Sequence, residues 1–122
     1  MHEVVSEAMT ADRVGSGDVR VLATPAALAL VERAAVASLA GRLPDGATTV
    51  GASVELAHLA PTPVGAEVVA RAHLDRVEGG RRLTFSFSVS DQAGEIAHGT
   101  HVRVVVDRRR FADAATARFE AK

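Results

Sequence analysis

The sequence contains no cysteine, no tryptophan and no tyrosine, and its only aromatic residues are four phenylalanines. The lack of cysteine excludes disulfides, thiolate nucleophiles and cysteine-based metal sites, and it fits a reducing compartment such as the cytoplasm. So few aromatic side chains argue against a surface that stacks the bases of single-stranded nucleic acid. Fourteen basic and fifteen acidic residues give a net charge of −1, whereas nucleic-acid-binding domains usually carry a basic excess.

The sequence also has no long apolar run. The first 19 residues include Glu3 and Glu7 and lack the apolar core of a signal peptide. The weakly polar run at 21–31 is too short to span a bilayer. With 122 residues, 48% of them hydrophobic, we expect a single domain over residues 1–122, located in the cytoplasm.

Residues 24–41, TPAALALVERAAVASLAG, predict a long helix. Thr24 is a good N-cap, Pro25 suits the first helical position, and Gly41 suits the C-terminal cap. The interior is alanine, leucine and valine on nearly all sides, which is typical of a buried helix.

Four strand-like runs follow the helix, at about 47–60, 66–78, 81–91 and 95–107. In the third run, apolar residues alternate with threonine and serine, as in a half-buried antiparallel strand. The connections are short, and Gly79-Gly80 is a hairpin signal. The N-terminal HEVVSEAM can add another strand. We therefore predict an α+β fold, in which a curved antiparallel β-sheet wraps a central long helix and a second subunit completes its cover.

A histidine interrupts an apolar row in the stretch TVGASVELAHLAPTPVG, residues 49–65. In a strand, residues two apart share a face, so His58 follows the apolar residues Val50, Ala52, Val54 and Leu56. It is either a core histidine with a hydrogen-bond partner or a general base, because imidazole exchanges its proton near neutral pH.

Two polar residues of the predicted helix carry a similar ambiguity. Glu32 has only apolar helical neighbours, so its carboxylate needs either a basic partner or an open cleft. Thr24 is either a plain N-cap or a group that contacts a substrate near the free N–H groups of the helix start. The two residues lie about 12 Å apart along the helix axis.

Other histidine and arginine motifs give weaker evidence of function. His98 and His101 stand three apart on a predicted strand and point to opposite faces, which argues against a shared metal ion. The basic cluster DRRR at 107–110 is either a solvated face or a contact for the phosphates of a nucleotide-bearing substrate. Serine-hydrolase, Walker and dinucleotide motifs are absent.

Four stretches taken together resemble the fluoroacetyl-coenzyme A thioesterase family: ATPAALALVE, VGASVELAHLAPTPVG, VEGGRRLTFSFSVSD and EIAHGTHVRVVV. The resemblance extends from about residue 22 to residue 111. Thr24 and Glu32 are eight residues apart, and Glu32 and His58 are twenty-six apart, as in the family. The GTH-x-R strand and the Pro/Gly loop after the histidine also match.

The resemblance implies a hot-dog fold and a homodimer, or a dimer of dimers, with active sites at the dimer interface. It implies hydrolysis of acyl-CoA thioesters without a metal or redox cofactor, since CoA is part of the substrate. Thr24, Glu32 and His58 match the catalytic set, while Gly51 and Arg103 match residues that lie near the acyl group. In this hypothesis His58 is the general base and then the general acid, and Thr24, Glu32 or water attacks the thioester.

One segment departs from the family, because GSGDVRVLA before Thr24 lacks the aromatic residues of the fluoroacetyl-specific member. We therefore expect a short-chain acyl-CoA thioesterase. One alternative is a non-catalytic hot-dog module that binds acyl-CoA or a related ligand; the joint presence of threonine, glutamate and histidine favours the enzyme. A hydratase or dehydratase is disfavoured because residues 24–41 contain no aspartate.

Overall fold

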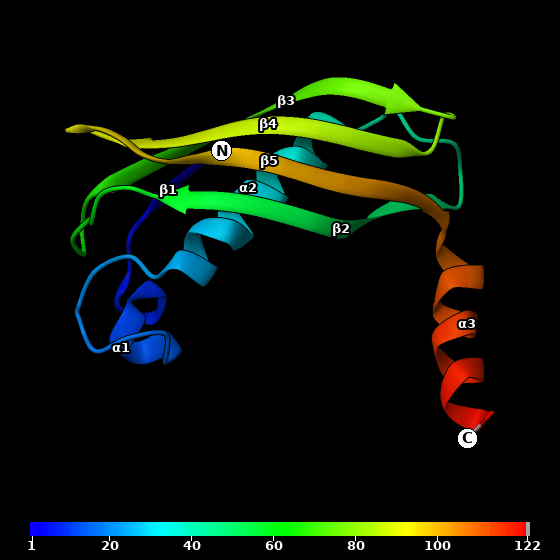
Figure 1. The fold of residues 1–122 in the computed structure, drawn as a ribbon, viewed down its shortest axis with the longest axis horizontal. Coiled ribbons are helices and arrows are strands. Elements are labelled where there is room, and N and C mark those ends of the chain that lie inside the picture. The colour runs from blue at the N-terminus through cyan, green and yellow to red at the C-terminus, as the bar shows by residue number, and fades with distance from the viewer. Residues whose placement is uncertain (122) are drawn as a thin grey trace.

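The computed structural model describes residues 1–121, and Figure 1 shows a curved sheet with a long helix against one face. The elements follow in this order: β1 (His2–Val4), η1 (Glu7–Met9), α1 (Ala11–Val14), α2 (Thr24–Ser38), β2 (Ala47–His58), β3 (Glu67–Glu78), β4 (Arg82–Asp91), β5 (Gly94–Asp107) and α3 (Arg108–Glu120). The strands form one antiparallel sheet in the order β1-β3-β4-β5-β2. The predicted α+β architecture is confirmed.

Helix α2 begins one residue earlier than the sequence predicts. The N-cap is Ala23, so Thr24 is the first helical residue and the prediction of Thr24 as N-cap was wrong. The helix ends at Ser38 rather than near Gly41. Only one face is buried, through Ala27, Leu30, Val31, Ala34 and Ala35. Val36 is 49% exposed, so within one protomer the helix is not covered on all sides.

Strand β4 supplies much of the core that faces α2. Its apolar residues alternate with polar ones as predicted, and the buried set is Leu83, Phe85, Phe87 and Val89. The β3–β4 hairpin turns at Gly79 and Gly80, whose φ angles of +61° and +66° lie in the left-handed region that glycine adopts readily, and Arg81 completes the connection between the paired Glu78 and Arg82.

Strand β2 is the edge of the sheet next to β5, and it contains a bulge. Its register shifts between Gly51 and Ser53: Gly51 pairs with Arg103, but Val54 pairs with His101. One extra residue in a strand exchanges the two faces for all residues beyond it. The predicted single row of alternate residues is therefore interrupted, and Gly51 shares the inner face with His58.

Three short or exposed elements were not predicted: η1, α1 and α3. Helix α3 projects from the end of β5 and buries none of its side chains (Figure 1). Asp107 caps it by accepting a hydrogen bond of 2.9 Å from the Arg110 backbone N–H, so the basic cluster forms the exposed first turn of this helix. No helix within residues 1–121 is long and apolar enough to cross a membrane.

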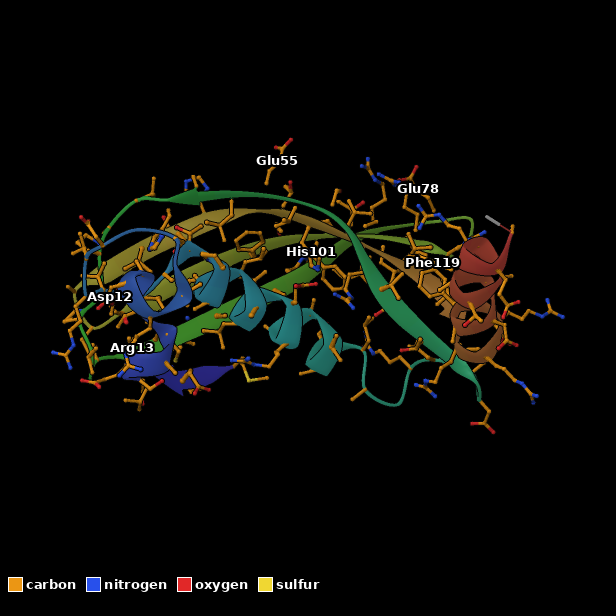
Figure 2. All side chains as sticks on the ribbon, turned by 90° about the horizontal axis from the view of Figure 1, so that it is seen from below. Asp12, Arg13, Glu55, Glu78, His101 and Phe119 are labelled. Carbon is orange, nitrogen blue, oxygen red and sulfur yellow. The ribbon has the colours of Figure 1, made fainter. Side chains whose placement is uncertain are left out.

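Phe85 tests the assignment of the core beneath the C-terminal half of α2. Its side chain is fully buried and packs with Ala35, Leu39 and Leu83. Phe85→Ala should lower the free energy of unfolding by about 3–5 kcal/mol, measured by urea denaturation. Phe119→Ala is the matched control, because Phe119 is 75% exposed on α3 (Figure 2). It should change the free energy of unfolding by about 0.5 kcal/mol or less; equal losses would contradict this core.

Candidate active site

Thr24 and His58 form a hydroxyl–imidazole pair. Thr24 lies at the start of α2 and His58 at the end of β2, and Thr24 Oγ1 is 2.7 Å from His58 Nδ1. The hydroxyl is free for this contact because it does not cap the helix. His58 Nε2 is buried and has no hydrogen-bond partner among residues 1–121. A hydroxyl held by an imidazole is the arrangement of a nucleophile and its base.

Glu32 and Arg103 form an ion pair between α2 and β5. Arg103 Nη1 lies 3.3 Å from Glu32 Oε2, while Nε and Nη2 donate to the side-chain and main-chain oxygens of Thr49 at 2.9 and 3.0 Å. The Arg103 side chain is 7% exposed but that of Glu32 is 42% exposed. Glu32 thus has the basic partner that one sequence interpretation required, and it also keeps an open side.

Gly51 makes room for the carboxylate of Glu32. A Cβ at this position would lie 2.7 Å from Glu32 Oε2, which is closer than real Cβ atoms approach an oxygen. Any side chain at residue 51 would therefore displace the carboxylate or the strand. The structure gives this glycine a steric reason next to Glu32.

His101 belongs to the same cluster, although the sequence analysis gave it no role. Its Nε2 lies 3.2 Å from Arg103 Nη1 and its Nδ1 lies 2.9 Å from the Ser53 carbonyl oxygen. The signal was the H-x-R spacing, since residues two apart on a strand share a face. His98 is exposed whereas His101 is 2% exposed, as opposite faces require. Within residues 1–121, no group of three histidine or acidic side chains is arranged to hold a metal ion.

The predicted site residues fall into two groups within one protomer. A cavity of about 200 Å³ is lined by Leu28, Glu32, His101 and residues 51–54. A second cavity of about 220 Å³ is lined by Val21, His58 and residues 59–61. No hydrogen bond joins Thr24 or His58 to Glu32 in the described part of the chain. Seven strand positions, roughly 20 Å, separate Gly51 from His58.

Another serine, histidine and aspartate meet on the outer face of β3 and β4. Asp75 Oδ1 lies 2.7 Å from His73 Nδ1 and accepts a hydrogen bond of 3.0 Å from Ser86 Oγ. The contacts with His73 and then Ser86 lower the pKa of the Asp75 carboxyl. Because the serine donates to the carboxylate and not to the imidazole, the trio lacks the nucleophile–base contact of a catalytic triad.

The chain is similar to proteins of a known family. Residues 5–109 match the family model described as fluoroacetyl-CoA-specific thioesterase. The chain belongs to this family. A fluoroacetyl-CoA thioesterase of Streptantibioticus cattleyicolor is 38% identical over 91 residues, which cover 75% of this chain. The match spans 65% of that protein, slightly less than two thirds of its length.

Solved structures of similar proteins share the fold. The fluoroacetyl-CoA thioesterase FlK has a TM-score of 0.90 at 31% identity, over 96% of this chain and 90% of that one. A hot-dog-like protein from Thermanaerovibrio acidaminovorans has a TM-score of 0.87 at 32% identity, over 98% of this chain and 87% of that one. The hot-dog fold predicted from the sequence is confirmed.

Thr49 provides a test of the ion-pair network in this thioesterase fold. Thr49→Val keeps the shape but removes the hydroxyl that accepts from Arg103 Nε, and it leaves a buried N–H without a partner. We expect the free energy of unfolding to fall by about 1–3 kcal/mol in urea denaturation. Thr48→Val, on the opposite face of β2, is the control and should lose about 0.5 kcal/mol or less. A Thr49→Val protein as stable as wild type would remove this bond from the network.

Proposed function

We propose that the protein is a thioesterase that hydrolyses a short-chain acyl-CoA to the free acid and CoA. The observation that carries this proposal is the 2.7 Å contact between Thr24 Oγ1 and His58 Nδ1 in a member of the thioesterase family. FlK structures contain acetyl-CoA, or fluoroacetate with CoA, which supports acyl-CoA as the ligand class here. A module that only binds its ligand has no need of a hydroxyl–imidazole pair.

The segment before Thr24 supports a general short-chain preference. Residues 15–23 contain no aromatic side chain. Leu22 and Ala23 are buried, while Val19 is 58% exposed and points away from the core. No ring from this segment is therefore available to select a fluorinated acyl group next to Thr24. We propose acetyl to butyryl thioesters as the substrate range.

In the proposed mechanism, His58 Nδ1 takes the proton of the Thr24 hydroxyl while Oγ1 attacks the thioester carbonyl carbon. The C–S bond then breaks, and the protonated His58 gives its proton to the CoA thiolate. A water molecule, deprotonated by His58, hydrolyses the acyl ester on Thr24 and restores the hydroxyl. In this mechanism, backbone N–H groups at the start of α2, next to Thr24, stabilise the oxyanion.

We also propose that a second copy of the chain completes each active site. Strand β2 is a long edge strand, and residues 51–55 are all exposed. Such an edge presents unpaired backbone groups to another strand. A two-fold axis between Val54 and Glu55 would pair two β2 strands antiparallel and set Gly51 opposite the partner's His58. Figure 2 shows Glu55 pointing outward at this edge.

This pairing joins the two groups of site residues. The Glu32 carboxylate lies against Gly51, so the dimer would bring Glu32 of the partner subunit towards His58. When Nδ1 accepts from Thr24, the proton on Nε2 needs an acceptor, and Nε2 is the buried nitrogen without a partner in the protomer. The carboxylate would then orient His58 and stabilise its charged form, as the acid of a catalytic triad does.

The proposed reaction uses only side chains, backbone N–H groups and water. We propose that it needs no metal or redox cofactor and that CoA enters solely as part of the substrate. A single catalytic domain over residues 1–122 and a cytoplasmic location stay predictions from the sequence.

A panel of acyl-CoA thioesters with detection of the free thiol tests the activity. Wild type should release CoA from at least one short-chain substrate. Glu32→Gln and His58→Ala should each lower kcat by roughly a hundredfold or more, as for loss of a general base or its partner. Thr24→Ser should keep more activity than Thr24→Val, because only serine retains the hydroxyl. Binding of CoA thioesters without any turnover would instead identify a binding module.

Mixing two inactive variants tests the shared site. Glu32→Gln and His58→Ala subunits, unfolded together and refolded, form mixed dimers in which one of the two sites has both wild-type residues. Because half of the dimers are mixed, the recovered rate should reach about a quarter of the wild-type value. Each variant refolded alone is the control. Mixed dimers that stay inactive would place Glu32 and His58 of one subunit in the same site.

A further inference from the structure

We infer that His101 is a positioning residue that fixes the direction of Arg103 and, through it, the carboxylate of Glu32. His101 is 2% exposed on the inner face of β5 (Figure 2). It makes two hydrogen bonds, one to a side chain of the site and one to the bulge of β2. The inference concerns a bond network within one protomer. Only its kinetic consequence rests on the proposed thioesterase activity.

The neighbours of His101 determine which ring nitrogen carries the proton. An arginine side chain can only donate hydrogen bonds, so Nε2, at 3.2 Å from Arg103 Nη1, must accept. A carbonyl oxygen can only accept, so Nδ1, at 2.9 Å from the Ser53 oxygen, must donate. Both bonds exist together only in the neutral ring with the proton on Nδ1. A second proton on Nε2 would point at the guanidinium and break this bond.

The ring is also held in its plane by packing. The Phe85 ring lies at a centroid distance of 6.4 Å with a tilt of 30° to the imidazole, and the His101 side chain is almost fully buried. His101 therefore cannot turn Nε2 away from Arg103 without also breaking its hydrogen bond to the Ser53 carbonyl oxygen. All three side-chain nitrogens of Arg103 donate hydrogen bonds, and this fixes the orientation of the guanidinium. In that orientation Nη1 is directed at Glu32 Oε2.

The same ring links the carboxylate to the strand that carries His58. Ser53 is the first residue after the register shift of β2, and its carbonyl accepts from His101. One side chain thus ties the bulge and the guanidinium together. The lone pair of Nε2 is occupied by Arg103, so His101 is not a second proton acceptor for substrate.

Two substitutions separate the bonds. His101→Asn places an amide N–H near the position of Nδ1 and keeps the bond to Ser53, but it leaves Arg103 Nη1 without this acceptor. His101→Gln places an amide oxygen near the position of Nε2 and keeps the bond to Arg103, but it loses the bond to the bulge. His98→Asn, on the exposed face of the same strand, is the matched control.

The first measurement needs no turnover. Nitrogen-15 NMR of the wild-type protein at neutral pH should show His101 protonated on Nδ1 only. The Arg103 guanidinium, assigned by comparison with Arg103→Lys, should rotate slowly about its C–N bonds in wild type, His98→Asn and His101→Gln. In His101→Asn it should rotate faster. A proton on Nε2, or unchanged rotation in His101→Asn, would overturn the inference.

The second measurement compares kcat with KM for acyl-CoA hydrolysis. Loss of positioning should lower kcat of His101→Asn by roughly tenfold or more, with KM changed by about twofold or less. His101→Gln should keep kcat within about threefold of wild type, even if its unfolding temperature falls. A His101→Asn enzyme with wild-type kcat, or equal kcat losses in the two variants, would overturn the positioning role. A wild-type protein without turnover would refute the proposed function and leave the NMR test decisive for His101.

Discussion

The single extra residue in β2 between Gly51 and Ser53 decides which side chains face the helix. Without the bulge, strand alternation would put Gly51 and His58 on opposite faces, because they are seven residues apart. With it, Gly51 faces Glu32 and His58 faces Thr24 on the same side of the sheet. The bulge therefore lets one strand carry both groups of site residues along α2. Bulges of this kind are frequent at sheet edges and next to active sites, where they redirect a side chain.

A buried guanidinium imposes the second constraint. Removing Arg103 from water is costly unless its donors are satisfied, and here Thr49, His101 and Glu32 accept from them. Thr49 lies before the bulge, while His101 reaches the Ser53 carbonyl after it. The charge network consequently fixes the strand on both sides of the register shift. Folding and the placement of Glu32 depend on the same hydrogen bonds.

The fold could largely be predicted from the sequence, whereas the catalytic roles of the candidate site residues stay predictions. The architecture follows from local patterns. The alternation in β4 and the alanine-rich helix indicate which side chains are buried, and Gly79-Gly80 indicates a turn. The bulge was not visible, since Gly51, Ala52 and Ser53 suit a regular strand equally well. Helix α3 was missed because a helix that buries nothing has no apolar period. The spacing of Thr24, Glu32 and His58 pointed to the site but could not show that they form two separate groups.

The separation of the Glu32 group from the His58 group suggests a role for the exposed edge strand β2 in the proposed dimer. The proposed two-fold pairing of β2 would satisfy the exposed backbone of residues 51–55, and the same symmetry would bring one subunit's Glu32 group to the other's His58 group. Formation of the proposed dimer would then cover the β2 edge and complete the active site at the same time. In the described part of a protomer, His58 Nε2 is a buried nitrogen without a hydrogen-bond partner, which is unfavourable in free energy. A hydrogen bond to a carboxylate of the partner subunit would remove this penalty. In the proposed dimer, catalytic competence and dimer stability would thus be linked through a single hydrogen bond, because the carboxylate of one subunit would pair with His58 Nε2 of the other.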